Sequence, residues 1–494
     1  MPVYLGFDVD AGDVIIGGTG VDYIFGFQGD DRLEGHGGAD LLDGGGGADT
    51  FVLRASAGQT SDSPGGEAVT IQGFSPFDDG DGDRMLIQAT GLRDFDAATQ
   101  IIGDAPLGAD YRVDLNGDGD TDDAADIEVN LPGLTLSNDE AKAATRLSLT
   151  GTDDADTLKG GPNSDRLEGG AGADRLTGGA GSDAFVFSST IGAGSDSHVG
   201  ALTRIKDLVA PGGNGDSDRI SLEVFGVSRL DLANDVTTTA TDTNGLHRFQ
   251  VDLTGDDAFD SRDDIVFLYE GRDLADGTAT LMIDLDFEGS ADDDVVFGSD
   301  GDDRFLGKAG ADTINLGGGA NQVVFENAND GAAPGSLRLA EADRIRGFNS
   351  DDDILFDATL IDTLTEGERY STFTQNVGSE GAANFDTATG KLYYFSADPV
   401  GEDGLDDRSA IASALNAGDA AFAGVTEGDS ALLVLREVDT GVGDMGIYHF
   451  VSGGDEDDGD AALLDASDQL TLMGLIEDVN INDDGIDEGV FGAA

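Results

Sequence analysis

A nine-residue period constrains what this chain can fold into. In the stretch from Ala11 to Val52, an Asp recurs at every ninth residue, and the residue two places after it is apolar. Glycine dominates the first, second and fourth places of each nine, and the pattern returns in two later arrays. The recurring acidic residues are Asp13, Asp22, Asp31, Asp40 and Asp49, then Asp156, Asp165, Asp174 and Asp183, then Asp294, Asp303 and Asp312.

This spacing predicts an all-β fold, a parallel β-roll or β-solenoid with strand-rich spacer segments. Glycine adopts positive φ without steric cost, so the first six residues of each nine can turn sharply. The last three, such as Tyr23–Phe25, then form a short strand whose middle side chain faces inward. Two turns and two strands close one coil, so Asp13 and Asp31, in successive coils, stack on the same edge.

Stacked carboxylates of this kind predict a metal site. Parallel strands lie about 4.7–4.9 Å apart, so neighbouring carboxylates repel unless a cation lies between them. Ca²⁺ takes oxygens from carboxylates and from backbone carbonyls, which the glycine turns expose. The predicted ligands are the array Asp residues and turn glycines, among them Gly17, Gly20, Gly35, Gly44, Gly169, Gly178, Gly298 and Gly307. A disordered Gly/Asp-rich linker, the alternative, gives no reason for the periodic apolar residue.

These nonapeptides closely resemble those of the repeats-in-toxin (RTX) family, the haemolysin-type calcium-binding repeats. The resemblance implies a right-handed parallel β-roll, calcium as the bound metal, and folding on meeting extracellular calcium. It also implies export by a type I secretion system without a cleaved N-terminal signal. The sequence departs from the pattern at Asn163, at Leu316 and at Asn321, which replaces a ligand Asp. The last site of the third array is therefore left open.

The segments between the arrays also repeat. Ala109–Leu136 aligns without a gap on His247–Leu274, which predicts an internal triplication. The predicted modules are 1–148, 149–286 and 287–494, the third with a strand-rich C-terminal extension. Within that extension Ser430–Glu437 and Met445–Ser452 predict a hairpin. The final residues, Asp487–Ala494, resemble the family's uncleaved export signal, although an ordinary frayed tail fits them nearly as well.

A second type of calcium loop is predicted in the first spacer. Asp114, Asn116, Asp118 and Asp120 place oxygen ligands at alternate positions, with Gly119 at the sixth place, as in an EF-hand loop. The twelfth place is Ala rather than Glu, and the flanking residues are typical of strands rather than helices. We therefore expect a calcium loop between two strands, with a solvated turn as the alternative.

Composition excludes several classes of function. Acidic residues number 100 and basic residues 26, so a net charge of −74 argues against nucleic acid and anionic membranes as partners. No apolar run reaches the length of a membrane span, and no secretory leader precedes the first array. Cysteine is absent, as are HExxH, GxSxG and the phosphate-binding loop. The expectation is therefore a protein that is not an enzyme.

Three functions stay open at this stage. The first is an extracellular structural protein that polymerises into a surface layer, matrix or filament, as a homo-oligomer of secreted subunits. The second is an adhesin or carbohydrate-binding protein with cell-surface polysaccharide as its partner, and the third is a secreted enzyme with a site in 357–494. Only Pro2–Asp10 precedes the first array. We therefore expect the first coil to dock onto another subunit, at Ser430–Ser452 or Leu470–Ile476; the alternative is that Pro2–Asp10 folds over the coil as a small cap and the protein is a monomer.

Overall fold

The computed structural model describes residues 2–357 apart from short loop segments, of which the longest are 7–11, 63–67, 104–110, 120–125 and 241–245. Beyond residue 357 it describes residues 405–409, residue 411 and five strands. The chain is 47% strand and 6% helix with parallel sheets, which confirms the prediction of an all-β roll. Among the described residues, no helix is long and apolar enough to cross a membrane.

One layer of the roll is a single 14-stranded sheet, whose hydrogen-bonded path is parallel throughout. Its strands are, in spatial order, β2 (Val14–Ile16), β4 (Arg32–Glu34), β6 (Thr50–Ser56), β8 (Arg84–Thr90), β13 (Thr145–Thr150), β15 (Arg166–Glu168), β17 (Ala184–Thr190), β20 (Arg219–Phe225), β25 (Ile283–Glu288), β27 (Arg304–Leu306), β29 (Gln322–Phe325), β31 (Asp353–Phe356) and β36 (Phe491–Ala493), with β18 (Gly194–Ser195) pairing β17 off the path.

The opposite layer is divided into three sheets. The first contains β1 (Val3–Leu5), β3 (Tyr23–Gln28), β5 (Leu41–Gly46), β7 (Val69–Gln72), β12 (Ile127–Asn130), β11 (Tyr111–Val113) and β10 (Ile101–Gly103). The second contains β22 (Val236–Ala240), β23 (Leu246–Val251), β24 (Ile265–Glu270), β19 (Arg204–Ile205), β16 (Arg175–Thr177), β14 (Thr157–Lys159) and β9 (Asp94–Asp96). The third contains β21 (Arg229–Asp231), β26 (Val295–Phe297), β28 (Thr313–Asn315), β30 (Asp343–Arg346), β35 (Gln469–Val479), β34 (Gly443–Val451), β33 (Ser430–Glu437) and β32 (Leu392–Val400).

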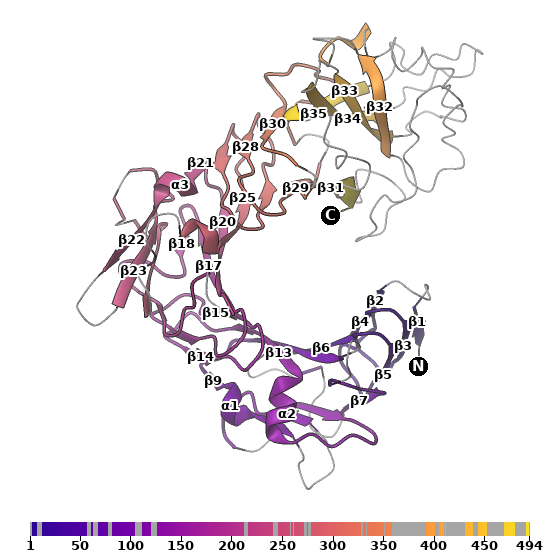
Figure 1. The fold of residues 1–494 in the computed structure, drawn as a ribbon, viewed down its shortest axis with the longest axis vertical. Helices are drawn as coiled ribbons and strands as arrows, with labels where there is room; N and C mark the ends of the chain where they lie inside the picture. Colours follow the sequence, from indigo (N-terminus) through magenta and orange to yellow (C-terminus); the bar gives the residue numbers. More distant parts are fainter. Residues whose placement is uncertain are drawn as a thin grey trace.

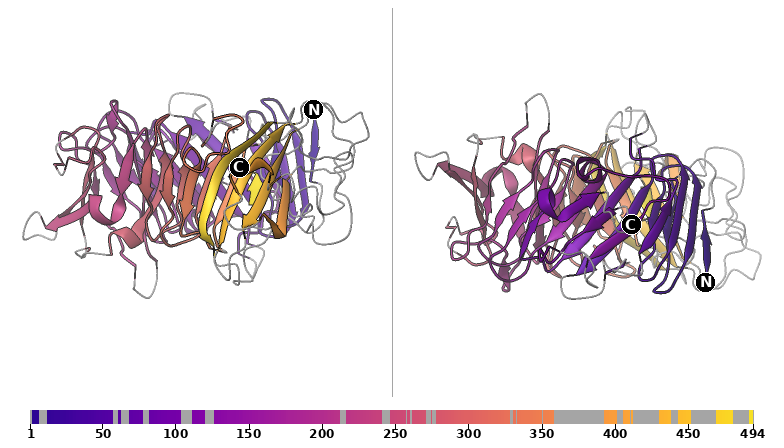
Figure 2. Two further views of the ribbon diagram at one scale, coloured as in Figure 1. Left: turned by 90° about the horizontal axis from the view of Figure 1, so that it is seen from above. Right: turned by 90° about the horizontal axis from the view of Figure 1, so that it is seen from below.

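The solenoid bends into an arc, and the 14-stranded sheet lines its concave side (Figure 1). The three smaller sheets lie on the convex side with the helices α1 (Ala97–Gln100), α2 (Asn138–Ala143) and α3 (Leu232–Asp235); a short 3₁₀ turn covers Thr280–Met282. Seen from above and below, the strands lie side by side across the long direction of the molecule (Figure 2). The predicted boundaries at 148/149 and 286/287 fall within β13 and β25, and the triplication stays a prediction.

The core lies between the two layers and is built by the apolar residue of each nonapeptide. Ile24, Leu33, Leu42 and Phe51 are fully buried. Leu33 lies opposite Phe51 in the parallel register of β4 and β6, as a coil of eighteen residues requires. Burying side chains of this size contributes about 1.5–3 kcal/mol each, and the buried residues form one cluster along the solenoid.

The described C-terminal strands complete both layers. β33 and β34 pair antiparallel, which confirms the predicted hairpin. β35 pairs with β30 in the convex layer, and β36 pairs with β31 in the concave layer. Because β33, β34 and β35 each have neighbours on both sides, the segments expected to receive another subunit present no free backbone edge. Among the described strands, those that end the two layers here are β32 and β36.

Candidate calcium sites

The array Asp residues form ladders along both turn edges of the roll. Asp31 accepts the backbone N–H of Asp13 through Oδ1 at 2.8 Å, and Asp49 accepts the N–H of Asp31 at 3.0 Å. On the other edge Asp40 accepts the N–H of Asp22 at 2.8 Å. The second and third arrays repeat this bond, as in Asp183 to Asp165, Asp174 to Asp156 and Asp312 to Asp294. One carboxylate oxygen of each rung therefore links two coils.

The second oxygen points into the glycine turn. A Cβ on Gly26 would lie 2.1 Å from Asp31 Oδ2 and 2.6 Å from the carbonyl oxygen of Gly44, in the next coil. Both distances are shorter than any real Cβ contact, so only glycine permits a carboxylate oxygen and a carbonyl oxygen to converge there. The sequence places Gly at this position because the oxygens need the space that a side chain would fill.

These oxygens are suited to a calcium ion. Asp31 Oδ2, Asp40 Oδ2 and Asp312 Oδ2 are buried and accept no hydrogen bond from the described residues. A buried carboxylate oxygen without a partner carries a large desolvation cost. A cation that brings its charge to both the carboxylate and the converging carbonyls removes that cost, and Ca²⁺ prefers this oxygen set.

Burial raises the pKa of many ladder carboxyls. It raises the pKa of Asp40 and Asp174 to about 6, of Asp49, Asp165, Asp303 and Asp312 to about 7, and of Asp183 to about 8. Desolvation is the largest cause in each, and neighbouring carboxylates such as Asp31 and Asp83 beside Asp49 add to it. Repulsion between carboxylates, which the nine-residue spacing predicts, thus raises these pKa values less than burial does.

Most of the predicted site residues lie along the ladders. For Gly17, Gly35, Gly44, Gly169, Gly178, Gly298 and Gly307, a Cβ would lie 2.0–2.8 Å from an array Asp oxygen, so these residues line the ladders. Gly20 faces open space and has no such neighbour. All the array Asp residues from Asp22 onward are buried, and Asp13 is partly exposed in the first coil. In the described part of the chain, no three Asp, Glu, His or Cys side chains gather, so carbonyls must complete each site.

The ladders continue into the spacers through residues that the nine-residue period does not mark. Asp83 accepts the N–H of Asp49 at 3.1 Å, and Asp218 accepts that of Asp183 at 3.0 Å. In the third array the rungs are Asp343, which accepts from Asp312 at 3.0 Å, and Asp352, which accepts from Asn321 at 2.9 Å. Each follows its partner by 31 to 35 residues, because a loop is inserted. In the sequence, each of these rungs is recognisable as an Asp that lies directly before a strand of alternating apolar residues or within it.

The loop at Asp114 has a different geometry. Asp114 Oδ1 accepts the N–H of Gly117 at 2.7 Å, Oδ2 accepts that of Gly119 at 3.0 Å, and Asn116 Oδ1 accepts that of Asp118 at 2.8 Å. The loop joins β11 and β12, which confirms the predicted strands at its flanks. Asp120 lies outside the described residues. Calcium binding by this loop stays a prediction.

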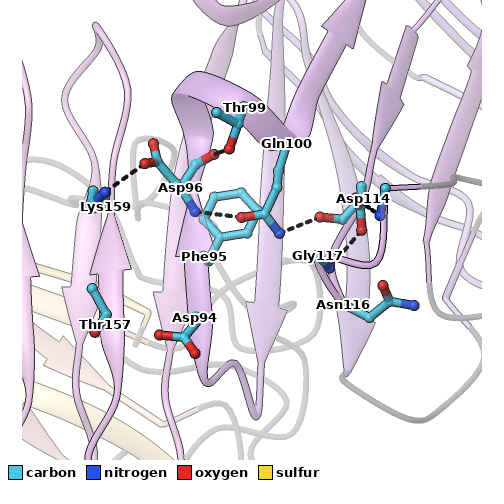
Figure 3. Close-up of a pocket in the computed structure, with 11 residues that line it drawn as sticks. Asp94, Phe95, Asp96, Thr99, Gln100, Asp114, Asn116, Gly117, Thr157 and Lys159 are labelled. Atoms are coloured by element: carbon cyan, nitrogen blue, oxygen red, sulfur yellow. Dashed lines mark hydrogen bonds and ion pairs between the residues drawn. The ribbon is translucent and has the colours of Figure 1, made fainter.

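A cavity of about 490 Å³ lies between the Asp114 loop and the second array. Figure 3 shows Asp96 between Lys159, whose Nζ is 2.6 Å away, and Gln100, which accepts the N–H of Asp96. Gln100 in turn donates to the carbonyl of Asp114 at 2.6 Å. This chain of bonds attaches the loop to the β-roll.

The fold and the ladders define a calcium-binding parallel β-roll. The model of the family described as RTX calcium-binding nonapeptide repeat matches in four copies, at residues 9–42, 16–51, 150–185 and 288–326. The chain therefore contains RTX calcium-binding nonapeptide repeats over these arrays, and such repeats bind calcium ions. No curated protein matches the chain.

Proposed function

We propose that this chain is an extracellular structural protein, exported by a type I secretion system, whose calcium-folded copies join end to end. The observation that carries the proposal is the first coil. Among the described strands, β1 and β2 are end strands with one pairing partner each. Val14 is 67% exposed and Ile16 49%, whereas the equivalent places in the next coil are Arg32 and Glu34. Val3 and Leu5 on β1 are also exposed.

The direction of the strands supports a head-to-tail contact. The concave sheet ends in β2 at one end of the solenoid and in β36 at the other, and its path is parallel throughout. A second copy placed end to end would therefore continue the sheet with the same strand direction. Contacts of this heterologous kind generate filaments when the rotation does not close a ring. Because each copy has a net charge of −74, calcium ions bound between copies are expected to reduce the repulsion between them.

Calcium-dependent folding supports export. RTX repeats are typical of secreted proteins. Extracellular calcium modules bind at about 10⁻⁴–10⁻³ M, so cytosolic calcium would leave the chain unfolded and competent for export. We propose a structural rather than a catalytic role because the described residues form the strands, the core and the Asp ladders of the roll. Much of 357–494, where the enzyme hypothesis placed a site, lies outside the described residues.

Light scattering and electron microscopy of pure protein in millimolar calcium test the assembly. The informative variant is Val14→Lys with Ile16→Lys, since charges on an edge strand oppose pairing with another chain. The matched control is Val199→Lys with Val209→Lys, which changes two similarly exposed valines elsewhere. We expect assembly by the natural chain and the control, and monomers from the edge variant with an unchanged calcium midpoint. Monomers of the natural chain at tens of micromolar would refute the proposal.

A further inference from the structure

The nonapeptide turns of the roll adopt two backbone conformations, which differ at the fourth residue before each array Asp. In a turn that opens one edge of an array, this residue has no positive φ and donates its N–H to Oδ2 of the Asp at 2.5–2.7 Å. The described Asp residues bonded in this way are Asp22, Asp156, Asp165, Asp294 and Asp303. The second oxygen of each of these carboxylates therefore has a partner within its own turn.

In a turn that follows another on the same edge of an array, the fourth residue before the Asp has a positive φ instead. Before Asp49, Asp174 and Asp183 this residue is glycine, with φ of 100°, 75° and 109° respectively. Before Asp31, Asp40 and Asp312 it is Phe27, His36 and Lys308, with φ of 83°, 57° and 69° respectively. Within the described part of the chain, these three are the non-glycine residues with a positive φ.

The positive φ leaves a carboxylate oxygen open to an ion. Oδ2 of Asp31, Asp40 and Asp312 is buried and accepts no hydrogen bond from the described residues, in contrast to Oδ2 in the opening turns. The backbone conformation that Phe27, His36 and Lys308 adopt is thus the one that prepares a ladder carboxylate for calcium.

Glycine adopts this conformation at no steric cost, whereas another L-residue does so at a cost of roughly 5- to 30-fold in the equilibrium constant. The glycine turns also stack closely on the turn before them. A Cβ on Gly45 would lie 2.0 Å from the carbonyl oxygen of Phe27, and one on Gly179 would lie 2.1 Å from that of Gly161. A residue that has a Cβ must hold its turn farther away, so the non-glycine turns are disfavoured in two ways.

The disfavoured turns are distributed unevenly along the chain. The first array contains two, at Phe27 and His36, and the second contains none, because Gly170 and Gly179 occupy these places. We propose that Phe27 and His36 lower the calcium affinity of the first array, so that the roll folds in a fixed order as calcium rises, the second array before the first. The arrays can respond separately because solenoid coils contact mainly their neighbours. Figure 1 shows the first array at the N-terminal end of the arc and the second near its middle.

This order also regulates the end-to-end assembly, a consequence that rests on the proposed function. β2, whose edge is proposed to join copies, belongs to the first array. The edge therefore forms only after the middle of the roll has folded. Copies then join as folded subunits, and a partly folded chain does not present a complete edge to its neighbours.

Hydrogen exchange of the full chain, followed by mass spectrometry at graded calcium concentrations, tests the order. The protein is kept dilute enough to be monomeric, so a failure of the end-to-end contact leaves the result unaffected. Peptides that cover β3 to β6 report on the first array, and peptides that cover β14 to β17 report on the second.

The informative variant is Phe27→Gly with His36→Gly. The matched control is Phe27→Ala with His36→Ala, which keeps a Cβ at positive φ and removes the remaining side-chain contacts, including that of His36 with Glu34. A second control is Thr152→Gly, at the same place in an opening turn, where no positive φ is relieved.

In the natural chain, the calcium midpoint of protection should be at least about threefold higher in the first array than in the second. The glycine pair should lower the first-array midpoint about twofold, because the greater freedom of glycine in the unfolded chain offsets part of the gain. The second-array midpoint should stay unchanged, the alanine pair should not lower the first-array midpoint, and Thr152→Gly should not lower the second-array midpoint.

The inference is overturned if the first array is protected at the same calcium concentration as the second or at a lower one. It is also overturned if the glycine pair leaves the first-array midpoint unchanged, since the position of this array at the end of the solenoid would then account for the order. An equal decrease in the alanine pair overturns it as well, because side-chain contacts rather than backbone conformation would then determine the affinity.

Discussion

Acidification should restore β structure to the chain when calcium is absent. Burial raises the pKa of Asp49 and Asp303 to about 7 and of Asp183 to about 8. Because the folded-state pKa lies above the unfolded value, the metal-free roll binds protons more tightly than the unfolded chain. Its stability is therefore greatest in acid and falls as the pH rises from about 4 to about 8.

The magnitude is large enough to decide whether the metal-free roll exists. A carboxyl whose pKa rises from 3.8 to about 7 costs the metal-free roll about 4 kcal/mol when it is ionised. Asp165, Asp303 and Asp312 share this value. Several such costs together match the roughly 5–15 kcal/mol that stabilises a folded protein. We therefore expect the metal-free chain to be unfolded at pH 8 and to regain β structure near pH 5.

Far-UV circular dichroism and hydrodynamic radius, measured in chelator between pH 8 and pH 5, provide the assay. Values nearer the isoelectric point of about 4.1 are avoided because the uncharged chain would associate. Adding calcium at pH 6 should then release protons, which an indicator dye in weak buffer detects, because the ion replaces protons on the ladder carboxyls. A metal-free spectrum that is the same at pH 5 and pH 8 would refute the reasoning.

Three substitutions test the ladders further. Asp49→Asn should raise the pH midpoint of metal-free unfolding and weaken calcium binding, whereas Asp43→Asn, on the outward face of β5, should change neither. Gly26→Ala should cost about 1–3 kcal/mol in calcium-loaded urea unfolding, and Gly20→Ala, which faces open space, less than about 0.5 kcal/mol. Phe27→Gly should raise the free energy of unfolding in urea by roughly 0.5 kcal/mol, since Phe27 has a φ of 83° and is half exposed.

The sequence predicts the parts of the fold that repeat at a fixed interval. One Asp and one apolar residue per nine are sufficient to place Leu33 opposite Phe51 in the core and Asp31 on the N–H of Asp13. The reason is that each coil contacts mainly its neighbours, so local spacing determines the contact. The strand-rich spacers and the C-terminal hairpin also follow from local alternation of apolar residues.

The arrangement across the spacers does not follow from local spacing. Asp343 continues a ladder from Asp312 only because the inserted loop returns to the same edge, and no periodicity marks its position. The single concave sheet depends on β8 pairing with β13, across a spacer that contains four strands and two helices of the convex side.

Asn321 shows what each rung requires. Its Oδ1 accepts the N–H of Asp303 at 3.0 Å, as an array Asp would. Its Nδ2, at the place of the second carboxylate oxygen, donates to the carbonyl of Gly318 at 3.1 Å and to Asp352 Oδ1 at 2.9 Å. The amide thus supplies internally the positive partner that we expect calcium to supply to Asp31, whose Oδ2 is buried without a hydrogen bond in the described residues. We therefore expect the last rung of the third array to form without calcium, and folding on calcium addition to be driven by the Asp rungs before it.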